Sequence, residues 1–358
     1  MTSPVDWDLA SRVAVRWAGS EPFSESYHYD RIERDFAQFT VQAEALVSET
    51  TGLYPDSGPA TAKVISRAEW IDVNVRSFQR LLRPLTDRLG EQMGSSVMAP
   101  VARRIAGFEL GVVLGWMSQR VLGQYDLLVV DDADSDDEGD VVYYVGPNVL
   151  ALEKRWGFPP SEFRLWLALH ELTHRAQFTG VPWMRDHFLS MVHELMEEVE
   201  PDPERFAAAI RRLVDERRSG ESSLSDGGLS ALFASDEQRA TMDRIAGMMS
   251  LLEGHGDVTM TRAGGDRVPS AERFHRVLHE RRQQTNRRSK LIHKLIGLEA
   301  KMAQYEQGER FIEAVEAVGG ERAVDHAWTG PEALPTIGEI RDPDRWIDRM
   351  GLLERAAS

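Results

Sequence analysis

The stretch LWLALHELTHRAQF, residues 165–178, decides how the chain folds. Its leucines, tryptophan and phenylalanine recur at helical spacing, and this pattern predicts a buried helix. Prolines at 159 and 160 mark where the helix begins, and Gly180 and Pro182 mark its end. Two histidines and a glutamate interrupt the apolar run, and burying ionisable groups without partners is costly. Something must therefore compensate for that cost.

The three ionisable residues form the pattern HExxH. In an α-helix each residue advances by about 100°, so His170 and His174 lie about 40° apart on one face and can reach one ion. Glu171 lies about 60° further round, where it flanks the metal and can accept a proton from the metal's water. A zinc ion would satisfy both imidazoles, and we predict a zinc site here.

A catalytic zinc site usually has three protein ligands and one open position. The sixth position after the second histidine is a glycine, so the metzincin spacing for a third histidine is absent. The best candidate for the third ligand is Glu253, in SLLEGHGDVTM, because it ends an apolar helix face. His255 as the ligand, or Glu253 as a simple charge at a helix end, remain alternatives.

Asp257 is a candidate for orienting a metal-bound histidine. It lies four residues after Glu253 and therefore on the same face if the helix continues. A carboxylate there could accept the second N–H of a ligating histidine and fix its tautomer. Gly254 and Gly256 weaken the helix at this point.

The bulk composition limits the classes of function. The chain has 358 residues, a net charge of −16 and no cysteine. Disulfides and thiolate ligands are excluded, so any metal must bind to histidine or carboxylate side chains. The negative charge disfavours nucleic-acid and anionic-membrane partners. The N-terminus has no secretory signal, and we expect a cytoplasmic protein.

The periodicity predicts a predominantly helical α+β protein with a small sheet. YDLLVV (125–130) and DVVYYV (140–145) are β-rich and suggest a hairpin. We expect one domain over 1–358, with subdomains 1–180 and 181–358. Glycines four apart at 111 and 115 predict close helix packing. Helical periodicity covers residues 6–18, 30–50, 67–89, 97–123, 186–218, 235–253 and, after a loop at 261–270, residues 271–318.

For four other features of the sequence we expect a structural explanation and no binding or catalytic role. The acidic run DDADSDDEGD (131–140) has alternating aspartates but lacks the glycine and glutamate of a calcium loop, so a solvated loop is expected. The basic run RRQQTNRRSK (281–290) is expected to be a solvated helix face. His193, in HELME, is expected at the surface, and GESSLSDGGLS (220–230) has the composition of a linker.

Several segments together resemble a known family. DWDLA, YVGPN, FRLWLALHELTHRAQFTGVPW, LLEGHGD and KMAQYEQGERF resemble the actinobacterial zincin-like family labelled as associated with deazaflavin-coenzyme biosynthesis. HExxH followed by a distant ExxxD also resembles the gluzincin pattern, although Gly256 departs from it. The resemblance implies a zincin-like fold and a zinc metallohydrolase. It matches His170, His174 and Glu253 to the ligands and Glu171 to the base.

The sequence thus predicts a zinc-dependent hydrolase, most simply a peptidase, with a peptide or small amide as substrate. Tyr305 is a candidate for stabilising the oxyanion, although most helical tyrosines are simply packed. The alternative is an inactive zincin scaffold that binds zinc structurally and acts through protein partners. An intact Glu171 favours catalysis, because a structural site needs no base there.

Overall fold

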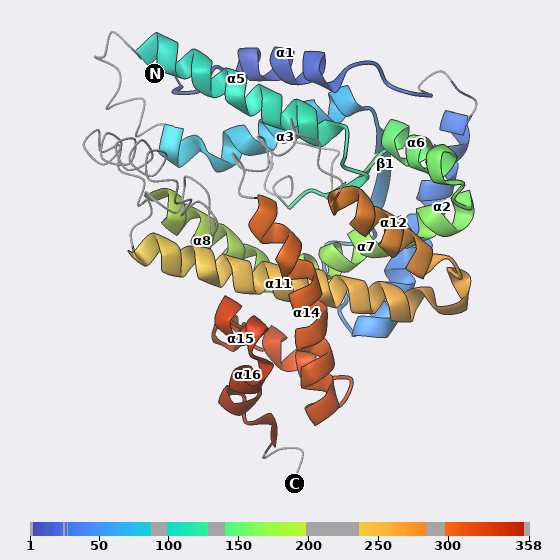
Figure 1. Ribbon diagram of the computed structural model, residues 1–358, viewed down its shortest axis with the longest axis vertical. Coiled ribbons are helices and arrows are strands. Elements are labelled where there is room, and N and C mark those ends of the chain that lie inside the picture. Colours follow the sequence, from blue (N-terminus) through green and yellow to red (C-terminus); the bar gives the residue numbers. More distant parts are fainter. Residues whose placement is uncertain are drawn as a thin grey trace, which may run out of the picture. The chain divides into compact units, whose positions relative to one another are not determined.

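The computed structural model describes residues 3–23, 26, 28–86, 99–127, 140–197, 236–283 and 298–353 (Figure 1). The chain forms two compact units. The first contains residues 1–182 and 259–278, and the second contains residues 183–258 and 279–358. The sequence suggested subdomains that meet near residue 180; the structure additionally assigns 259–278 to the first unit.

The first unit contains a three-stranded sheet with β3 (Val141–Val145) in the centre. Strand β2 (Gly123–Tyr125) pairs with β3 antiparallel, as the suggested hairpin requires, but it shares only Tyr125 with the β-rich run predicted at 125–130. Asp126 and Leu127 lie beyond the strand, and residues 128–130 lie outside the described residues. Strand β1 (Thr61–Ile65) pairs with β3 in parallel and was not predicted. All five residues of β3 are buried, so the sheet lies inside the unit.

Helices cover both faces of this sheet. On one face, the side chains of Val141, Tyr143 and Val145 pack in a core with residues of α1 (Trp7–Ala18), α3 (Arg67–Leu81) and α5 (Ala99–Ser118). On the other face, the Tyr144 ring stacks on Phe36 of α2 (His28–Thr51), and α7 (Pro160–Gly180) contacts β2. The helices of this unit are α1 (Trp7–Ala18), α2 (His28–Thr51), α3 (Arg67–Leu81), α5 (Ala99–Ser118), α6 (Gly146–Trp156), α7 (Pro160–Gly180) and α12 (Ala271–Gln283).

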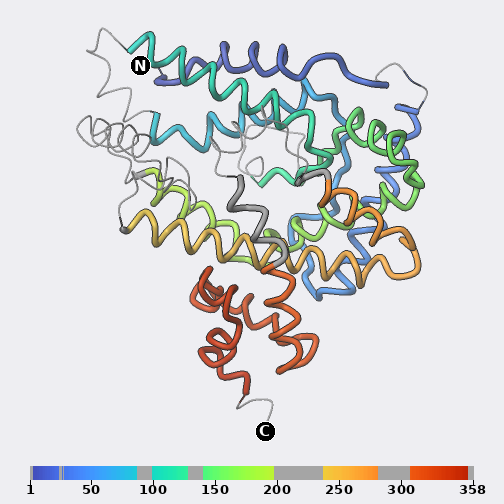
Figure 2. Tube along the Cα trace, in the orientation of Figure 1, coloured from blue at the N-terminus to red at the C-terminus, as the bar shows by residue number. Residues whose placement is uncertain are grey.

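Helices α1 and α5 run side by side, as Figures 1 and 2 both show. A Cβ atom at Gly111 or Gly115 would lie 2.6 Å from the backbone oxygen of Ala10 or Ala14. Because only glycine allows this approach, the predicted close packing at these two positions is confirmed. None of the helices in the described ranges is both long and apolar enough to cross a membrane.

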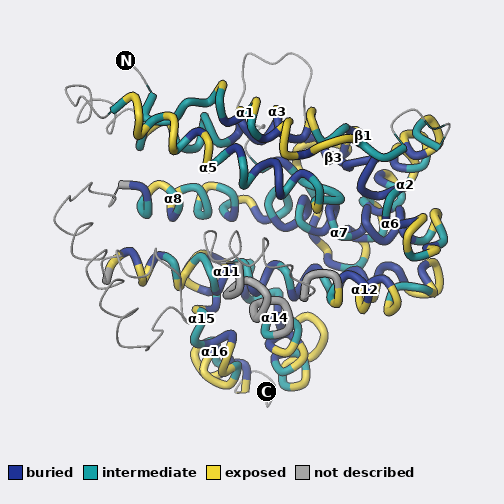
Figure 3. The backbone as a smooth tube through the Cα atoms, turned by 45° about the horizontal axis from the view of Figure 1, so that its top comes forward, coloured by how far each residue is buried: buried dark blue, intermediate teal, exposed yellow. Residues whose placement is uncertain are grey.

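Helix α7 is buried along most of its length, and Figure 3 shows it mainly in dark blue. Two arginines on it are buried and paired. Arg164 donates two hydrogen bonds of 2.8 Å to Glu153 of α6 and one to Asp35 of α2. Such forked pairs fix geometry as well as charge.

The second buried arginine, Arg175, directly follows the motif. Its guanidinium lies 2.5 Å from Glu44 of α2 and 2.5 Å from Asp140, which precedes β3. It also donates to the backbone oxygen of Gly58. Arg175 therefore holds α7 against α2 and the start of the sheet. Asp140, expected in a solvated loop, is buried because it serves this arginine.

The second unit is helical. One core cluster of this unit groups Leu251 with apolar residues of the C-terminal segment, among them Phe311 and Trp346. Its elements are α8 (Met184–Glu197), most of α11 (Asp236–Gly264), α14 (Leu298–Gly319), η4 (Ala323–Trp328), η5 (Pro331–Ala333), α15 (Ile337–Arg341) and α16 (Pro343–Arg349).

Helix α11 runs through Gly254 and Gly256 to Gly264, so the predicted end at 253 and the loop predicted from 261 are corrected. The reason is packing. A Cβ atom at Gly254 would meet the backbone of Gly308 on α14, and one at Gly308 would meet that of Ser250. The glycine at 254 permits a close helix crossing and does not break the helix.

Three predicted segments lie outside the described residues: the linker at 220–230, the basic side chains of 281–290, and positions 131–139 of the acidic run. The surface position of His193 on α8 is confirmed, because that residue is exposed.

We predict that Arg175→Leu lowers the free energy of unfolding by about 3–5 kcal/mol, because it leaves the buried carboxylate of Asp140 and the half-buried one of Glu44 without their cation. Denaturant titration followed by circular dichroism measures this. The matched control is Arg76→Leu, which removes an exposed pair with Asp72 and should change stability by less than about 1 kcal/mol. Equal effects of the two variants would contradict a buried anchoring role for Arg175.

Candidate metal centre

Helix α7 presents both histidines of the motif on one face. Their ring centroids are 4.6 Å apart and the ring planes are nearly perpendicular, at 86°. Both side chains are half-buried, whereas most of α7 around them is fully buried. The i, i+4 spacing therefore produces the juxtaposition expected from the sequence.

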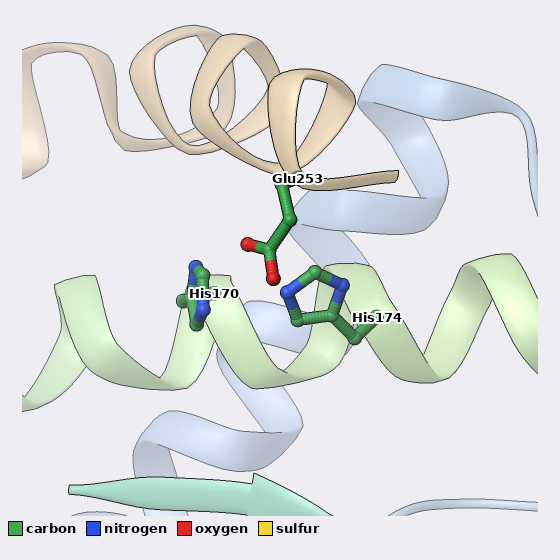
Figure 4. Close-up of side chains that lie close together, drawn as sticks. All are labelled: His170, His174 and Glu253. Atoms are coloured by element: carbon green, nitrogen blue, oxygen red, sulfur yellow. The ribbon is translucent and has the colours of Figure 1, made fainter. Parts of the chain in front are cut away.

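The third member of the group is Glu253 of α11. One ligand atom from each of His170, His174 and Glu253 lies within 4.8 Å of the others, and Figure 4 shows the carboxylate pointing toward the two rings. Within the described ranges, this is the one group of at least three residues that could hold a metal ion. Two imidazoles and one carboxylate are the donor set of many catalytic zinc sites, which keep a fourth position open. The donors therefore fit zinc.

Glu171 directly follows His170 in the sequence, and its side chain packs against strand β2. Its side chain is 6% exposed and abuts Gly123 of β2. A Cβ atom at position 123 would lie 2.5 Å from Oε1 of Glu171 and 2.7 Å from its Cδ and Cγ atoms. The absence of a side chain at Gly123 therefore leaves the space that the carboxylate occupies.

Tyr144 shares this side of the sheet, because it pairs directly with Gly123. Its hydroxyl forms a 2.8 Å hydrogen bond with that of Thr40. Burial raises the pKa of the Tyr144 phenol; the bond to Thr40 opposes the shift, and the negative charge of Glu171 adds to it. Tyr144 is therefore a neutral phenol at physiological pH.

His174 also has a partner on its own helix. Its Nδ1 atom lies 2.9 Å from Oε1 of Gln177, one turn further along, and the Gln177 side chain is fully buried. Neither Gly123 nor Gln177 was predicted from the sequence. A glutamine three residues after the second histidine of the motif is a sequence signal that could have indicated this contact.

The remaining candidates lie as follows. His255 is buried in the second unit, with its ring 5.2 Å from that of Trp328 and nearly perpendicular to it. Asp257 lies on α11 four residues after Glu253 and is half-buried. Its role as an acceptor for a ligating histidine stays a prediction. Tyr305 belongs to α14, but its side chain lies outside the described residues.

A buried HExxH helix beside a small sheet, with a distant glutamate near both histidines, defines the zincin class of metal site. The chain belongs to the zincin-like metallopeptidase family, whose model matches residues 5–347.

One solved structure is similar over nearly the whole chain. It is a crystal structure of a "putative hydrolase with a novel fold" from Chloroflexus aurantiacus. The two sequences are 30% identical, the match covers 97% of this chain and 99% of the other, and the TM-score is 0.69. No curated protein matches the sequence.

We predict that the purified protein binds about one zinc ion per chain, as a three-ligand site with an open position should. His170→Ala, His174→Ala and Glu253→Ala should each abolish stoichiometric zinc, measured by elemental analysis after dialysis. His193→Ala, at the exposed histidine of α8, is the matched control and should keep it. Full zinc occupancy in Glu253→Ala would remove that residue from the ligand set, and His255 would be tested next.

Proposed function

We propose that this protein is a zinc-dependent hydrolase that cleaves amide bonds, most simply those of a peptide, with Glu171 as the general base. The observation that carries the proposal is the position of Glu171. It is a buried carboxylate next to the group of three potential zinc ligands, and it occupies the space left by Gly123. Membership of the metallopeptidase family supports the same conclusion.

A bound zinc ion polarises a carbonyl oxygen and lowers the pKa of a coordinated water molecule to about 7. His170, His174 and Glu253 would hold the ion, and Glu171 performs the proton transfers. Its carboxylate accepts a proton as the water oxygen adds to the amide carbon. It then delivers that proton to the amide nitrogen as the carbon–nitrogen bond breaks, which releases a carboxylate and an amine.

The sheet supports a peptide as the substrate. Among the described strands, β2 lies at one edge of the order β1-β3-β2. An extended peptide can add to such an edge through main-chain hydrogen bonds. Because Gly123 of β2 abuts Glu171, a peptide that pairs with this edge would pass close to the base.

Some finer expectations remain part of this proposal. A cytoplasmic location is part of the proposal and rests on a composition without cysteine. The association with deazaflavin-coenzyme biosynthesis rests on the sequence resemblance. The second candidate function is a zincin scaffold that binds zinc structurally and acts through protein partners. The buried base of the proposed site favours the enzyme, because such a scaffold gains nothing from a carboxylate in that position.

Glu171→Gln decides between enzyme and scaffold. Glutamine keeps the size of the side chain but cannot accept the proton. We expect the variant to fold, to keep its zinc, and to lose amide-hydrolysing activity by about 10²-fold or more. Activity is measured with a peptide and amide library on which the wild type is first shown to act. A wild type that hydrolyses nothing, with the same cellular partners as Glu171→Gln, would support the scaffold.

Gly123→Ala tests the placement of the base without touching it. The three nearest atoms to the added Cβ all belong to the Glu171 side chain, so the carboxylate must move. We expect normal folding, retained zinc and an activity loss of about 10²-fold, the scale of a 1 Å misplacement. Gly338→Ala is the matched control, because a Cβ atom there approaches no atom closer than 3.7 Å.

The double variant makes this test sharper. If the alanine acts through Glu171, adding it to Glu171→Gln should cause little further loss, because the two changes remove the same function. Multiplicative losses in the double variant would show that Gly123 acts independently of the base.

A further inference from the structure

We propose that Gln177 is a positioning residue that fixes the tautomer of His174 and so presents the Nε2 atom of that ring to the metal. The inference rests on the metal site of the proposed function, but not on hydrolysis.

The hydrogen bond between the two side chains is the starting observation. Oε1 of Gln177 lies 2.9 Å from Nδ1 of His174. Gln177 is 0% exposed, and a buried amide is costly unless it is hydrogen-bonded. The contact also follows from the helix, since residues three apart lie on neighbouring turns of one face. The hydrogen bond is therefore part of the buried structure of α7 and not a chance surface contact.

The orientation of the His174 ring shows which of its nitrogen atoms faces the other potential ligands. Figure 4 shows one ring nitrogen of His174 turned toward Glu253 and the other turned away from it. Since Nδ1 is bonded to Gln177, the nitrogen that faces the other donors is Nε2. A metal needs the lone pair of that atom, so the ring proton must reside on Nδ1, where the amide oxygen accepts it.

Glutamine can in principle serve either tautomer, because its amide has both an oxygen and an NH₂ group. With the NH₂ group toward Nδ1, the ring proton would sit on Nε2 and block the metal. With the oxygen toward Nδ1, as here, Nε2 is free to bind. Metal binding and this amide orientation therefore stabilise each other.

The neutral charge of glutamine also matters. Many zinc-bound histidines donate to a carboxylate, which raises the basicity of the ring. Here Glu253 and Glu171 already bring two negative charges to a doubly charged ion. The nearby cation, Arg175, is committed to Glu44 and Asp140. Gln177 orients the ring without adding a third negative charge to a buried place.

The experiment compares two substitutions at position 177 by zinc affinity, measured by chelator competition. Gln177→Met has a similar shape but no good acceptor, and it should weaken zinc binding by roughly 10- to 100-fold. Gln177→Glu restores an acceptor and should bind zinc at least as tightly as the wild type. Thr173→Val is the matched control, since Thr173 is equally buried on α7 and its hydroxyl bonds only to the Leu169 carbonyl among its described hydrogen bonds. That variant should keep wild-type affinity.

Wild-type affinity in Gln177→Met, or a failure of Gln177→Glu to restore binding, would overturn the proposal. If Gln177→Met does not fold, nitrogen-15 NMR of zinc-loaded wild type decides. We expect the His174 ring to carry its proton on Nδ1 and to bind zinc through Nε2, and the reverse assignment overturns the proposal.

None of these readouts depends on turnover. A chain that meets every expectation for Gln177 but hydrolyses no amide contradicts the proposed hydrolase alone. A wild type that binds no zinc overturns the role of Gln177 together with the metal site.

Discussion

The structure of the first unit depends on one constraint, which is that helix α7 is buried while carrying several ionisable side chains. Each of its two buried arginines is compensated by two carboxylates from other segments. Removing one partner from such a pair lowers the free energy of unfolding far more than replacing both partners with apolar residues. The arginine pairs therefore fix how α7 lies against α2, α6 and the start of β3. The two histidines and Glu171 are fixed in space as a consequence.

The fixed position of α7 matters most on the side of the helix that lies against the sheet. Strand β3 places Tyr144 beside Gly123, and Gly123 leaves space for the carboxylate of Glu171. The pairing register is thus part of the site. A shift of one residue would turn a different side chain of β2 toward α7, because neighbouring residues of a strand face opposite sides.

The sequence predicted the features whose chemistry is local. HExxH is such a feature, because helical geometry alone brings His170 and His174 together. Glu253 was proposed because a carboxylate at the end of an apolar face needs a partner. The structure places it near both histidines, although α11 does not end there. Gly123 could not be found, since its role depends on strand pairing and on a helix distant in the chain. Strand β1 was missed because TAKVI is short and its outward residues are partly exposed.

From the sequence we expected glycine to weaken the helix, but Gly254 allows α14 to approach α11 closely. That contact keeps α11 helical through Glu253, where a break would have let the carboxylate move freely. Glycine thus has three uses here: helix packing at Gly111, helix crossing at Gly254, and space for the buried carboxylate of Glu171 at Gly123.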